Sequence, residues 1–341
     1  MTPLRLILVG LGARSRVWQR VIADNPDAQI VAACDPDPAA RARAAEARPD
    51  LPIGAAISDI VGVAADAAVL ATPPGGRERQ IEACCAAGLA ILAEKPLADD
   101  VALAARYVAM AETAGIPLIV GLNFRYLAVT QALRELLRSG AIGRPEFGRF
   151  LYERWRDGTQ GWLNSYPLSM DHPMLWEQSI HHFDLMRFVY GTDAARLQAH
   201  TFNPSWSMYR GDANVSALIH FENGMCVTYQ GTWQAGHEPM NFDWRTDGTD
   251  GIAVQRAMFG DLGWAPRMQA GLTEVPLPPH EPWITDAAAL LRMFVATCRG
   301  ADPECTGRDH LQSLYMLAAC ILSSERRASV AIPEIAEMAA A

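Results

Sequence analysis

The sequence predicts an α/β protein in which a doubly wound parallel sheet over residues 1–122 precedes an α+β domain over residues 123–341. The first domain is predicted because short apolar runs alternate with alanine-rich segments of helical spacing, as in a parallel sheet covered on both faces. The second is predicted because strand-like runs follow one another directly, with a hairpin signal at Asn223-Gly224. Such runs indicate a large, mostly antiparallel open sheet.

The strands of the first domain are expected in five apolar runs: "LRLILVG", "IVAACD", "AAVLATPP", "AILAEKP" and "IPLIVGL". Helices are expected between them, for example over 36–48, 77–87 and 99–114. In a doubly wound sheet, ligands bind at the carboxyl ends of the strands. The residues that follow the apolar runs are therefore candidates for a ligand site: Gly10 to Ser15, Asp35, Thr72-Pro73-Pro74, Glu94-Lys95-Pro96 and Asn123.

The second domain is expected to begin with a helix over 128–140. Its expected strands are 147–155, 196–203, 213–221 and 225–233, with weaker ones at 240–247 and 251–258. Helices over 284–299 and 308–324 close the chain, and they are candidates for packing back on the first domain.

Composition excludes several classes of function. A net charge of −9 argues against nucleic acid or an anionic membrane as partner, since both need clustered Lys and Arg. The seven cysteines form no Cys-x-x-Cys pair, which argues against a zinc module or disulfide framework and favours the cytoplasm. The N-terminus lacks a signal-peptide layout, and no window approaches the roughly 18 uncharged residues of a membrane span.

The first strand is followed by Gly10-x-Gly12-x-x-Ser15, the glycine pattern of a Rossmann dinucleotide site. Gly10 permits a tight turn, Gly12 lets a pyrophosphate approach the backbone, and the next helix offers free N–H groups. Asp35 ends the second strand, where a carboxylate binds a ribose diol and repels a 2′-phosphate. The pattern thus favours NAD over NADP, although Arg14 and Arg16 are potential phosphate ligands. The expected cofactor contacts in the turn are Gly10, Leu11, Gly12, Ala13, Arg14 and Ser15.

Lys95 is the candidate for catalysis in the first domain. A lysine at the end of a central strand lies where a substrate meets the nicotinamide, and its ammonium stabilises negative charge on a reacting oxygen. Glu94 and Pro96 flank it, and the proline is expected to fix the backbone. Thr72 with Pro73 and Pro74 is expected to form a ledge for the nicotinamide or its ribose; an ordinary turn is the alternative.

A helix over 176–190 is expected to carry the general base. Helical projection places a core stripe on one face: Trp176, Ile180, Phe183, Met186 and Tyr190. The opposite face is expected to line a cleft: Glu177, His181, Asp184 and Phe188. A histidine has an ordinary pKa close to neutrality and suits a general base, so His181 is assigned this role. Glu177 would orient its ring, whereas His182 is expected to serve packing or the rim.

Further residues are candidates for binding a sugar or polyol, because aromatic faces beside neutral and acidic polar groups suit such a ring. These are Trp155, Trp162, Asn164, Asp184, Arg125 and Tyr126, with Asn123 as a cofactor contact. Packing within the domain is the alternative for each, and for Asp184 the alternative is to support its helix. A metal site built from Glu177, His181, Asp184 and His172 is the rival interpretation, but we expect no metal because hydride chemistry needs none.

Several motifs together resemble the glucose–fructose oxidoreductase, inositol dehydrogenase and MocA-type family across the whole chain: "GLGARS", "CDPD", "ATPP", "AEKPLA", "VGLNFRY", "GAIGRP", "IHHFDL" and "CTGRDHLQSL". The resemblance implies that Lys95, His181 and Glu177 complete one active site, and that the protein is a homodimer or homotetramer through its C-terminal sheet. Two departures stand out. Members usually carry a histidine where this chain has Gly76 and Arg77, and an aspartate where it has Glu177.

The function expected from the sequence is NAD-dependent oxidation of a secondary hydroxyl of a sugar, polyol or cyclitol, or reduction of the ketone. His181 would take the hydroxyl proton and Lys95 would stabilise the oxygen. Two alternatives stay open. One is a redox-neutral enzyme that uses tightly held NAD for glycoside cleavage or epimerisation. The other is a dinucleotide-binding sensor without catalysis.

Overall fold

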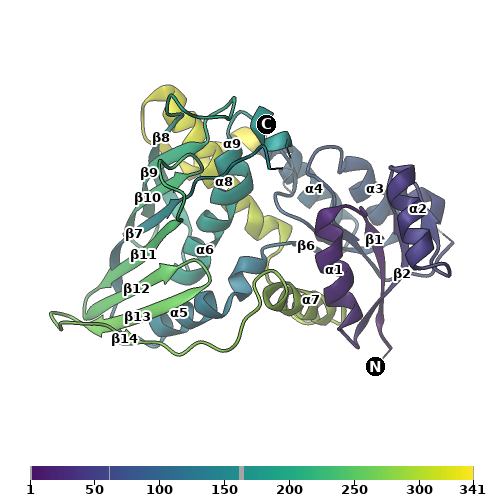
Figure 1. Cartoon of the computed structure of the whole chain (residues 1–341), viewed down its shortest axis with the longest axis horizontal. Coiled ribbons are helices and arrows are strands. Elements are labelled where there is room, and N and C mark those ends of the chain that lie inside the picture. The colour runs from purple at the N-terminus through teal and green to yellow at the C-terminus, as the bar shows by residue number, and fades with distance from the viewer. Residues whose placement is uncertain (1, 61, 161–164, 341) are drawn as a thin grey trace. The chain divides into compact units, whose positions relative to one another are not determined.

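The computed structural model describes residues 2–60, 62–160 and 165–340, which divide into two compact units (Figure 1). The first unit runs from the N-terminus to Tyr126 and from Glu281 to Leu311. The second runs from Leu127 to His280 and from Gln312 to the C-terminus. The sequence assigned 123–341 to the second domain, with its last helices as candidates for packing on the first. In the structure residues 281–311 belong to the first unit.

Among the described residues, the first unit contains six parallel strands, which we call sheet A, in the order β3-β2-β1-β4-β5-β6. The order reverses between β1 and β4, which is the switch point of a doubly wound fold, so the predicted fold class is confirmed. The strands are β1 (Leu4–Val9), β2 (Ala28–Cys34), β3 (Ile53–Gly54), β4 (Ala67–Leu70), β5 (Ala90–Ala93) and β6 (Leu118–Val120).

The strands and helices of this unit follow from their residues. Every residue of β4, β5 and β6 is buried, as the unbroken apolar runs predicted. Asp37 caps α2 by accepting hydrogen bonds from the N–H groups of Ala39 and Ala40, and left-handed Gly88 ends α3. The helices are α1 (Ala13–Ala23), α2 (Pro38–Ala47), α3 (Glu78–Ala87), α4 (Val101–Thr113) and α7 (Thr285–Cys298), with short helices η1 (Ile57–Ile60) and η2 (Asn123–Tyr126).

The described part of the second unit contains nine strands, which we call sheet B, in the order β14-β13-β12-β11-β7-β10-β9-β8-β15. Neighbours are antiparallel except β7 and β10, so the predicted mostly antiparallel sheet is confirmed. The strands are β7 (Pro145–Glu153), β8 (Ala194–Phe202), β9 (Asn214–Phe221), β10 (Cys226–Thr232), β11 (Asn241–Gly248), β12 (Gly251–Ala257), β13 (Gly260–Pro266), β14 (Thr273–Glu274) and β15 (Val330–Ala331). The sequence did not predict β13, β14 or β15.

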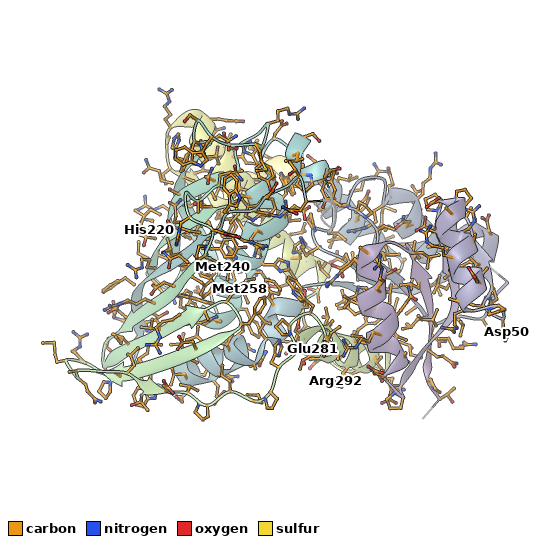
Figure 2. All side chains as sticks on the ribbon, in the orientation of Figure 1. Asp50, His220, Met240, Met258, Glu281 and Arg292 are labelled. Atoms are coloured by element: carbon orange, nitrogen blue, oxygen red, sulfur yellow. The ribbon has the colours of Figure 1, made fainter. Side chains whose placement is uncertain are left out.

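Helices cover one face of sheet B, where α5, α6 and α8 lie (Figure 1). Side chains project from both faces of the sheet (Figure 2), and Phe147 and Leu218 are exposed. An oligomer formed through this sheet stays a prediction. The helices are α5 (Ala128–Arg138), α6 (Ile180–Tyr190), α8 (Gly307–Arg326) and α9 (Ile332–Ala340), with short helices η3 (Tyr166–Ser169) and η4 (Leu175–Ser179).

The helix predicted over 176–190 differs from its projection in two ways. Residues Leu175–Ser179 form a π-helix, which has more residues per turn than the α-helix assumed for the projection. All residues from Ile180 to Val189 are buried, because α6 packs against α5, the rings of sheet B and α8. Burial therefore does not separate the predicted core face from the predicted cleft-lining face, and the role of His181 and Glu177 in a cleft stays a prediction.

His182 lies in the core of the second unit, as its predicted packing role implied. Its Nδ1 lies 2.9 Å from the Tyr229 hydroxyl and its Nε2 3.0 Å from the Gln178 side-chain amide. The ring also packs against Phe150 and Tyr152, with centroids 4.7 and 4.8 Å away. Burial lowers the pKa of His182 from 6.5 to about 3, so the folded protein holds a neutral imidazole here.

This burial predicts a pH-dependent stability. Between pH 6.5 and about 3 the unfolded chain binds a proton at His182 that the folded protein does not bind. The free energy of unfolding is thus expected to fall as the pH decreases through this window, while the contribution of His182 is complete above pH 6.5. We expect a His182→Phe variant to show a smaller fall in melting temperature between pH 6.5 and 5. A His220→Phe control in β9 should retain the wild-type slope, and parallel curves for wild type and His182→Phe would contradict the assignment.

Candidate functional site

The turn between β1 and α1 has the shape of a dinucleotide site. Gly10 has a φ of 91°, and a Cβ there would lie 2.9 Å from the carbonyl oxygen of Ala71, so only glycine fits. A Cβ on Gly12 would meet no atom within 4 Å, so the space above the start of α1 is open to a ligand. Ser15 is fully buried and donates from Oγ to the Gly12 carbonyl at 2.7 Å, which holds the turn against the helix.

Asp35 follows β2 and lies against this turn. Its Oδ2 accepts a hydrogen bond from the N–H of Leu11 at 2.7 Å, and its Oδ1 accepts one from the N–H of Asp37 at 2.8 Å. The carboxylate is thus held beside the glycine turn, at the position from which an acidic residue binds the ribose of NAD. The residues of the turn and Asp35 therefore fit the dinucleotide.

The side chain of Arg14 pairs with Glu94, which lies 80 residues further along the chain. Arg14 Nε lies 2.6 Å from Glu94 Oε1, and Trp18 Nε1 donates to the same oxygen at 2.8 Å. This contact ties the start of α1 to the segment that follows β5. The Arg14 contact to a cofactor phosphate stays a prediction, and its backbone N–H is the group that the helix start offers for it.

The Thr72-Pro73-Pro74 turn follows β4, the neighbour of β1 and β5 in sheet A. Thr72 Oγ1 donates to the side-chain carbonyl of Gln80 at 2.8 Å, and the Thr72 carbonyl accepts a hydrogen bond from Arg77. Pro73 is exposed, so its ring is accessible as the predicted ledge.

Lys95 stands at the carboxyl end of β5, between buried Glu94 and buried Pro96. It is the only lysine of the chain, in which the other basic residues among the 29 Lys and Arg are arginines. The Lys95–Pro96 peptide is cis. Leu97 donates its N–H to Nε2 of buried His310, at the start of α8, at 3.4 Å, so the segment after Lys95 is also held from that side.

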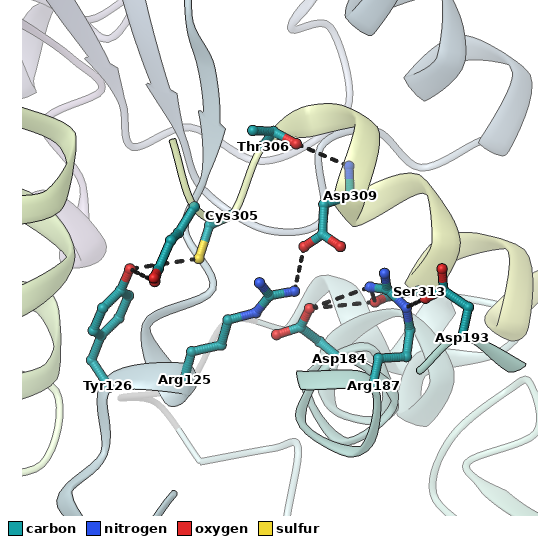
Figure 3. A network of polar contacts seen from close by, with 10 residues as sticks. Arg125, Tyr126, Asp184, Arg187, Asp193, Cys305, Thr306, Asp309 and Ser313 are labelled. Atoms are coloured by element: carbon teal, nitrogen blue, oxygen red, sulfur yellow. Dashed lines mark hydrogen bonds and ion pairs between the residues drawn. The ribbon is translucent and has the colours of Figure 1, made fainter. Parts of the chain in front are cut away.

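The three residues predicted at the domain junction lie in η2. Asn123 and Arg125 are buried, and Tyr126 is half-buried. Their polar ends contact carboxylates of the first unit. The amide of Asn123 donates to Asp286, and the hydroxyl of Tyr126 donates to Glu304. The guanidinium of Arg125 contacts Asp309 (Figure 3). These contacts fix the three side chains, and their predicted roles in binding cofactor or substrate stay predictions.

Glu177 and His181 lie in the second unit, on the π-helix and on the first turn of α6. Glu177 is half-buried, and its Oε1 accepts a hydrogen bond from the hydroxyl of Tyr166 at 2.7 Å. His181 is 4% exposed. A π-turn next to a buried histidine is notable, because π-bulges are frequent at functional sites.

Asp184, predicted to support the helix or bind a hydroxyl, is fully buried and belongs to a network of polar groups in the second unit (Figure 3). Its Oδ1 accepts a hydrogen bond from Ser313 Oγ at 3.4 Å and lies 3.8 Å from Nη1 of Arg187. Arg187 Nε in turn lies 2.6 Å from Asp193. These contacts favour the supporting role for Asp184.

A cavity of about 950 Å³ opens in the second unit beyond the ends of β7 and β10. Trp155, Trp206, Arg154 and Arg156 are among its lining residues. Trp206 is exposed but held by a hydrogen bond from its Nε1 to the Gln234 carbonyl at 3.1 Å. A fixed aromatic face beside polar groups suits a hydroxylated ring. Of the predicted substrate residues, Trp155 thus lines this cavity.

Two other predicted substrate residues, Trp162 and Asn164, lie outside the described residues. Within the described ranges, no group of three or more His, Cys, Asp and Glu side chains is arranged to hold a metal ion. No described helix combines the length and the apolar character that a bilayer span requires.

Two residues that organise the segment around Lys95 are not among the predicted site residues. Arg77 stands out in the sequence only as a departure from the family pattern, yet its guanidinium is fully buried against that segment. His310 lies in "CTGRDHLQSL", a motif to which the sequence assigns no role. No local signal reveals either contact, since the partners lie 17 and 213 residues away in the chain.

Comparison with known proteins places both units in one family. The profile described as "Oxidoreductase family, NAD-binding Rossmann fold" matches residues 4–122, and the GFO/IDH/MocA C-terminal domain matches residues 130–254. A D-apiose dehydrogenase of Paraburkholderia graminis is 28% identical over 96% of this chain and 89% of its own length. An inositol 2-dehydrogenase of Leifsonia xyli subsp. xyli is 32% identical over 67% of this chain and 66% of its own length.

The fold is also shared with solved structures. An oxidoreductase from Agrobacterium radiobacter in complex with NAD+, L-tartaric acid and magnesium superposes with a TM-score of 0.87 at 24% identity, covering 98% of this chain and all of its own. Since matched family profiles cover sheet A and most of sheet B, the chain belongs to the GFO/IDH/MocA family of oxidoreductases, with an NAD-binding Rossmann fold.

Proposed function

We propose that the protein oxidises a secondary hydroxyl of a sugar, polyol or cyclitol with NAD, or reduces the corresponding ketone. The observation that carries the proposal is the place of Lys95. It follows β5 in the same sheet whose β1 and β2 present the glycine turn and Asp35. Relatives named D-apiose dehydrogenase and inositol 2-dehydrogenase support a polyhydroxylated substrate.

The cofactor-binding residues act as a rigid frame. The backbone from Gly10 to Ser15 and the start of α1 bind the pyrophosphate, and Asp35 binds the adenosine ribose. Thr72, Pro73 and Pro74, together with Asn123, border the nicotinamide. When bound, NAD supplies the acceptor for the hydride that leaves the substrate carbon.

Lys95 binds the oxygen of the reacting hydroxyl through its ammonium group. As carbon loses hydride, negative charge on this oxygen is stabilised by the fixed positive charge. Glu94 contributes through its contacts with Arg14 and Trp18, which fix the backbone before Lys95. Lysine suits this role because its compact ammonium presents three donors to one oxygen.

His181 accepts the hydroxyl proton as general base. Glu177, which accepts a hydrogen bond from Tyr166, orients the imidazole or stabilises its protonated form. Trp155, Trp162, Asn164, Arg125 and Tyr126 complete the substrate contacts as predicted from the sequence, whereas Asp184 supports the helix that carries His181. His181 thus receives the proton of the carbinol oxygen, while NAD, when bound, would accept the hydride from the carbon.

The test is a screen of sugars, polyols and cyclitols with NAD and with NADP, followed by NADH absorbance. Accumulating NADH with at least one neutral polyol supports the proposal. Cofactor that co-purifies and is regenerated without net NADH would instead support the redox-neutral alternative. Stoichiometric NAD binding without any turnover across the panel would overturn the proposal in favour of a sensor.

Asp35 provides a prediction about cofactor choice. Replacing Asp35 by serine removes the carboxylate that repels a 2′-phosphate, so KM for NAD should rise about 10- to 100-fold while KM for NADP falls. An Asp50→Ser change at an exposed site (Figure 2) is the control and should leave both values as in the wild type. An unchanged NAD-to-NADP ratio in Asp35→Ser would remove Asp35 from the ribose site.

A further inference from the structure

One arginine of the first unit is fully buried beside the segment that carries Lys95. Arg77 stands at the start of α3 and is 0% exposed. A buried guanidinium is costly unless its donors are satisfied, so the groups around it show what it organises. We propose that Arg77 is a positioning residue for Lys95, an inference that rests on the role of Lys95 in the proposed function.

The guanidinium holds the backbone on both sides of Lys95. Nη1 of Arg77 donates to the carbonyl of Glu94 at 2.7 Å, to that of Pro96 at 2.8 Å and to that of Leu97 at 2.9 Å. The residue before Lys95 and the two residues after it are thus bound to one nitrogen. Rotation of the Glu94–Lys95 peptide or of the Pro96–Leu97 peptide would break a charge-assisted hydrogen bond, which is stronger than a neutral one.

The same side chain also holds the turn after β4. Nη2 of Arg77 donates to the Thr72 carbonyl, directly before Pro73 and Pro74. A planar guanidinium keeps its nitrogens at fixed separations. Arg77 therefore sets the place of Lys95 relative to the turn proposed to border the nicotinamide, and the distance between oxygen-binding and hydride-accepting groups depends on it.

Arginine offers more donors for this arrangement than histidine or glutamine. The two N–H groups of Nη1 serve three carbonyls, and Nη2 serves the fourth. A guanidinium carries five N–H groups, an imidazole at most two and an amide two. Arg77 contacts four backbone carbonyls, so a histidine or glutamine at this position would leave some of them without a donor. Arg77 thus holds the segment around Lys95 and the turn at Thr72 through one side chain.

The single lysine makes the test direct. Protein grown with isotope-labelled lysine reports on Lys95 alone by NMR, with or without turnover. The variants are Arg77→Gln and Arg77→His, which add no second lysine. The matched control is Arg106→Gln, because Arg106 of α4 is exposed and ion-pairs with Glu78, the residue after Arg77.

In Arg77→Gln we expect the Lys95 signal to shift and broaden, and its response to NAD to weaken. The kcat should fall about 10- to 100-fold, the loss expected for hydrogen bonds to a charged group, while KM and the Kd for NAD change less than about 3-fold. In a Lys95→Met background the same change should lower kcat no further, since Arg77 acts through Lys95. Arg106→Gln should match the wild type in every measurement.

A wild-type Lys95 signal in folded Arg77→Gln would overturn the inference, and so would a full further loss in the Lys95→Met background. If Arg77→Gln does not fold, the same measurements on Arg77→His decide. Failure of both to fold would assign Arg77 to the fold alone and overturn the positioning role. If the wild type oxidises no polyol, the proposed function fails, whereas the Lys95 signal still decides the role of Arg77.

Discussion

Lys95→Met is expected to lower kcat about 100- to 1,000-fold while the protein still binds NAD. Methionine keeps the length of the side chain but removes the positive charge that stabilises the reacting oxygen. The glycine turn and Asp35 do not depend on that charge, so the Kd for NAD should stay within a few-fold of the wild type. The measurements are steady-state kinetics on a substrate found in the screen and NAD titration by fluorescence.

The Lys95→Arg variant tests whether a positive charge alone is sufficient at this position. All other Lys and Arg positions of the chain are arginines, so an arginine would be expected here too if only the charge mattered. The ammonium is compact, whereas the guanidinium is planar and larger. We therefore expect Lys95→Arg to recover only a small part of the lost kcat. Unchanged turnover in Lys95→Met would end the assignment of Lys95 to the chemistry.

His181→Ala is expected to lower kcat about 100- to 10,000-fold, the usual contribution of a general base. It should also abolish the fall in kcat at low pH, because the group whose protonation stops the reaction is gone. The wild type should lose activity as the pH decreases, since a protonated imidazole cannot accept the hydroxyl proton. The measurement is the pH dependence of kcat for both proteins.

Two comparisons make this result specific. His220→Ala, in β9 of the same unit (Figure 2), should retain the wild-type pH profile. In the double variant Lys95→Met with His181→Ala, the loss should be smaller than the product of the two single losses, because groups that act on one carbinol are not additive. A retained acidic limb in His181→Ala would assign the base to another residue.

Much of the fold could be predicted from local pattern. The apolar runs of the first domain correspond to β1, β2, β4, β5 and β6, because a strand buried on both faces needs an unbroken apolar sequence. The hairpin at Asn223-Gly224 joins β9 to β10 as predicted. By contrast, β3, β14 and β15 have two residues each, too few for any periodicity to appear.

The candidate site was predictable only in part, for the same reason. Gly10, Asp35 and Lys95 could be predicted because each follows an apolar strand, where a ligand site of this fold lies. The π-turn before His181 and the burial of α6 on all sides were not predicted, since neither leaves a simple amphipathic pattern. Neither the π-turn nor the complete burial of a helix can be inferred from the spacing of apolar residues along the chain.

The sequence by itself determined the order of strands and helices, the glycine turn and the residue types at the strand ends, since these depend on neighbours in the chain. Only the tertiary structure decided which side chains hold the glycine turn and the strand ends in place. Arg77 reaches across 17 to 20 residues to the carbonyls around Lys95, and His310 reaches Leu97 across 213. A buried donor binds whichever acceptor packing brings within reach, and packing is a property of the whole unit rather than of any stretch of sequence.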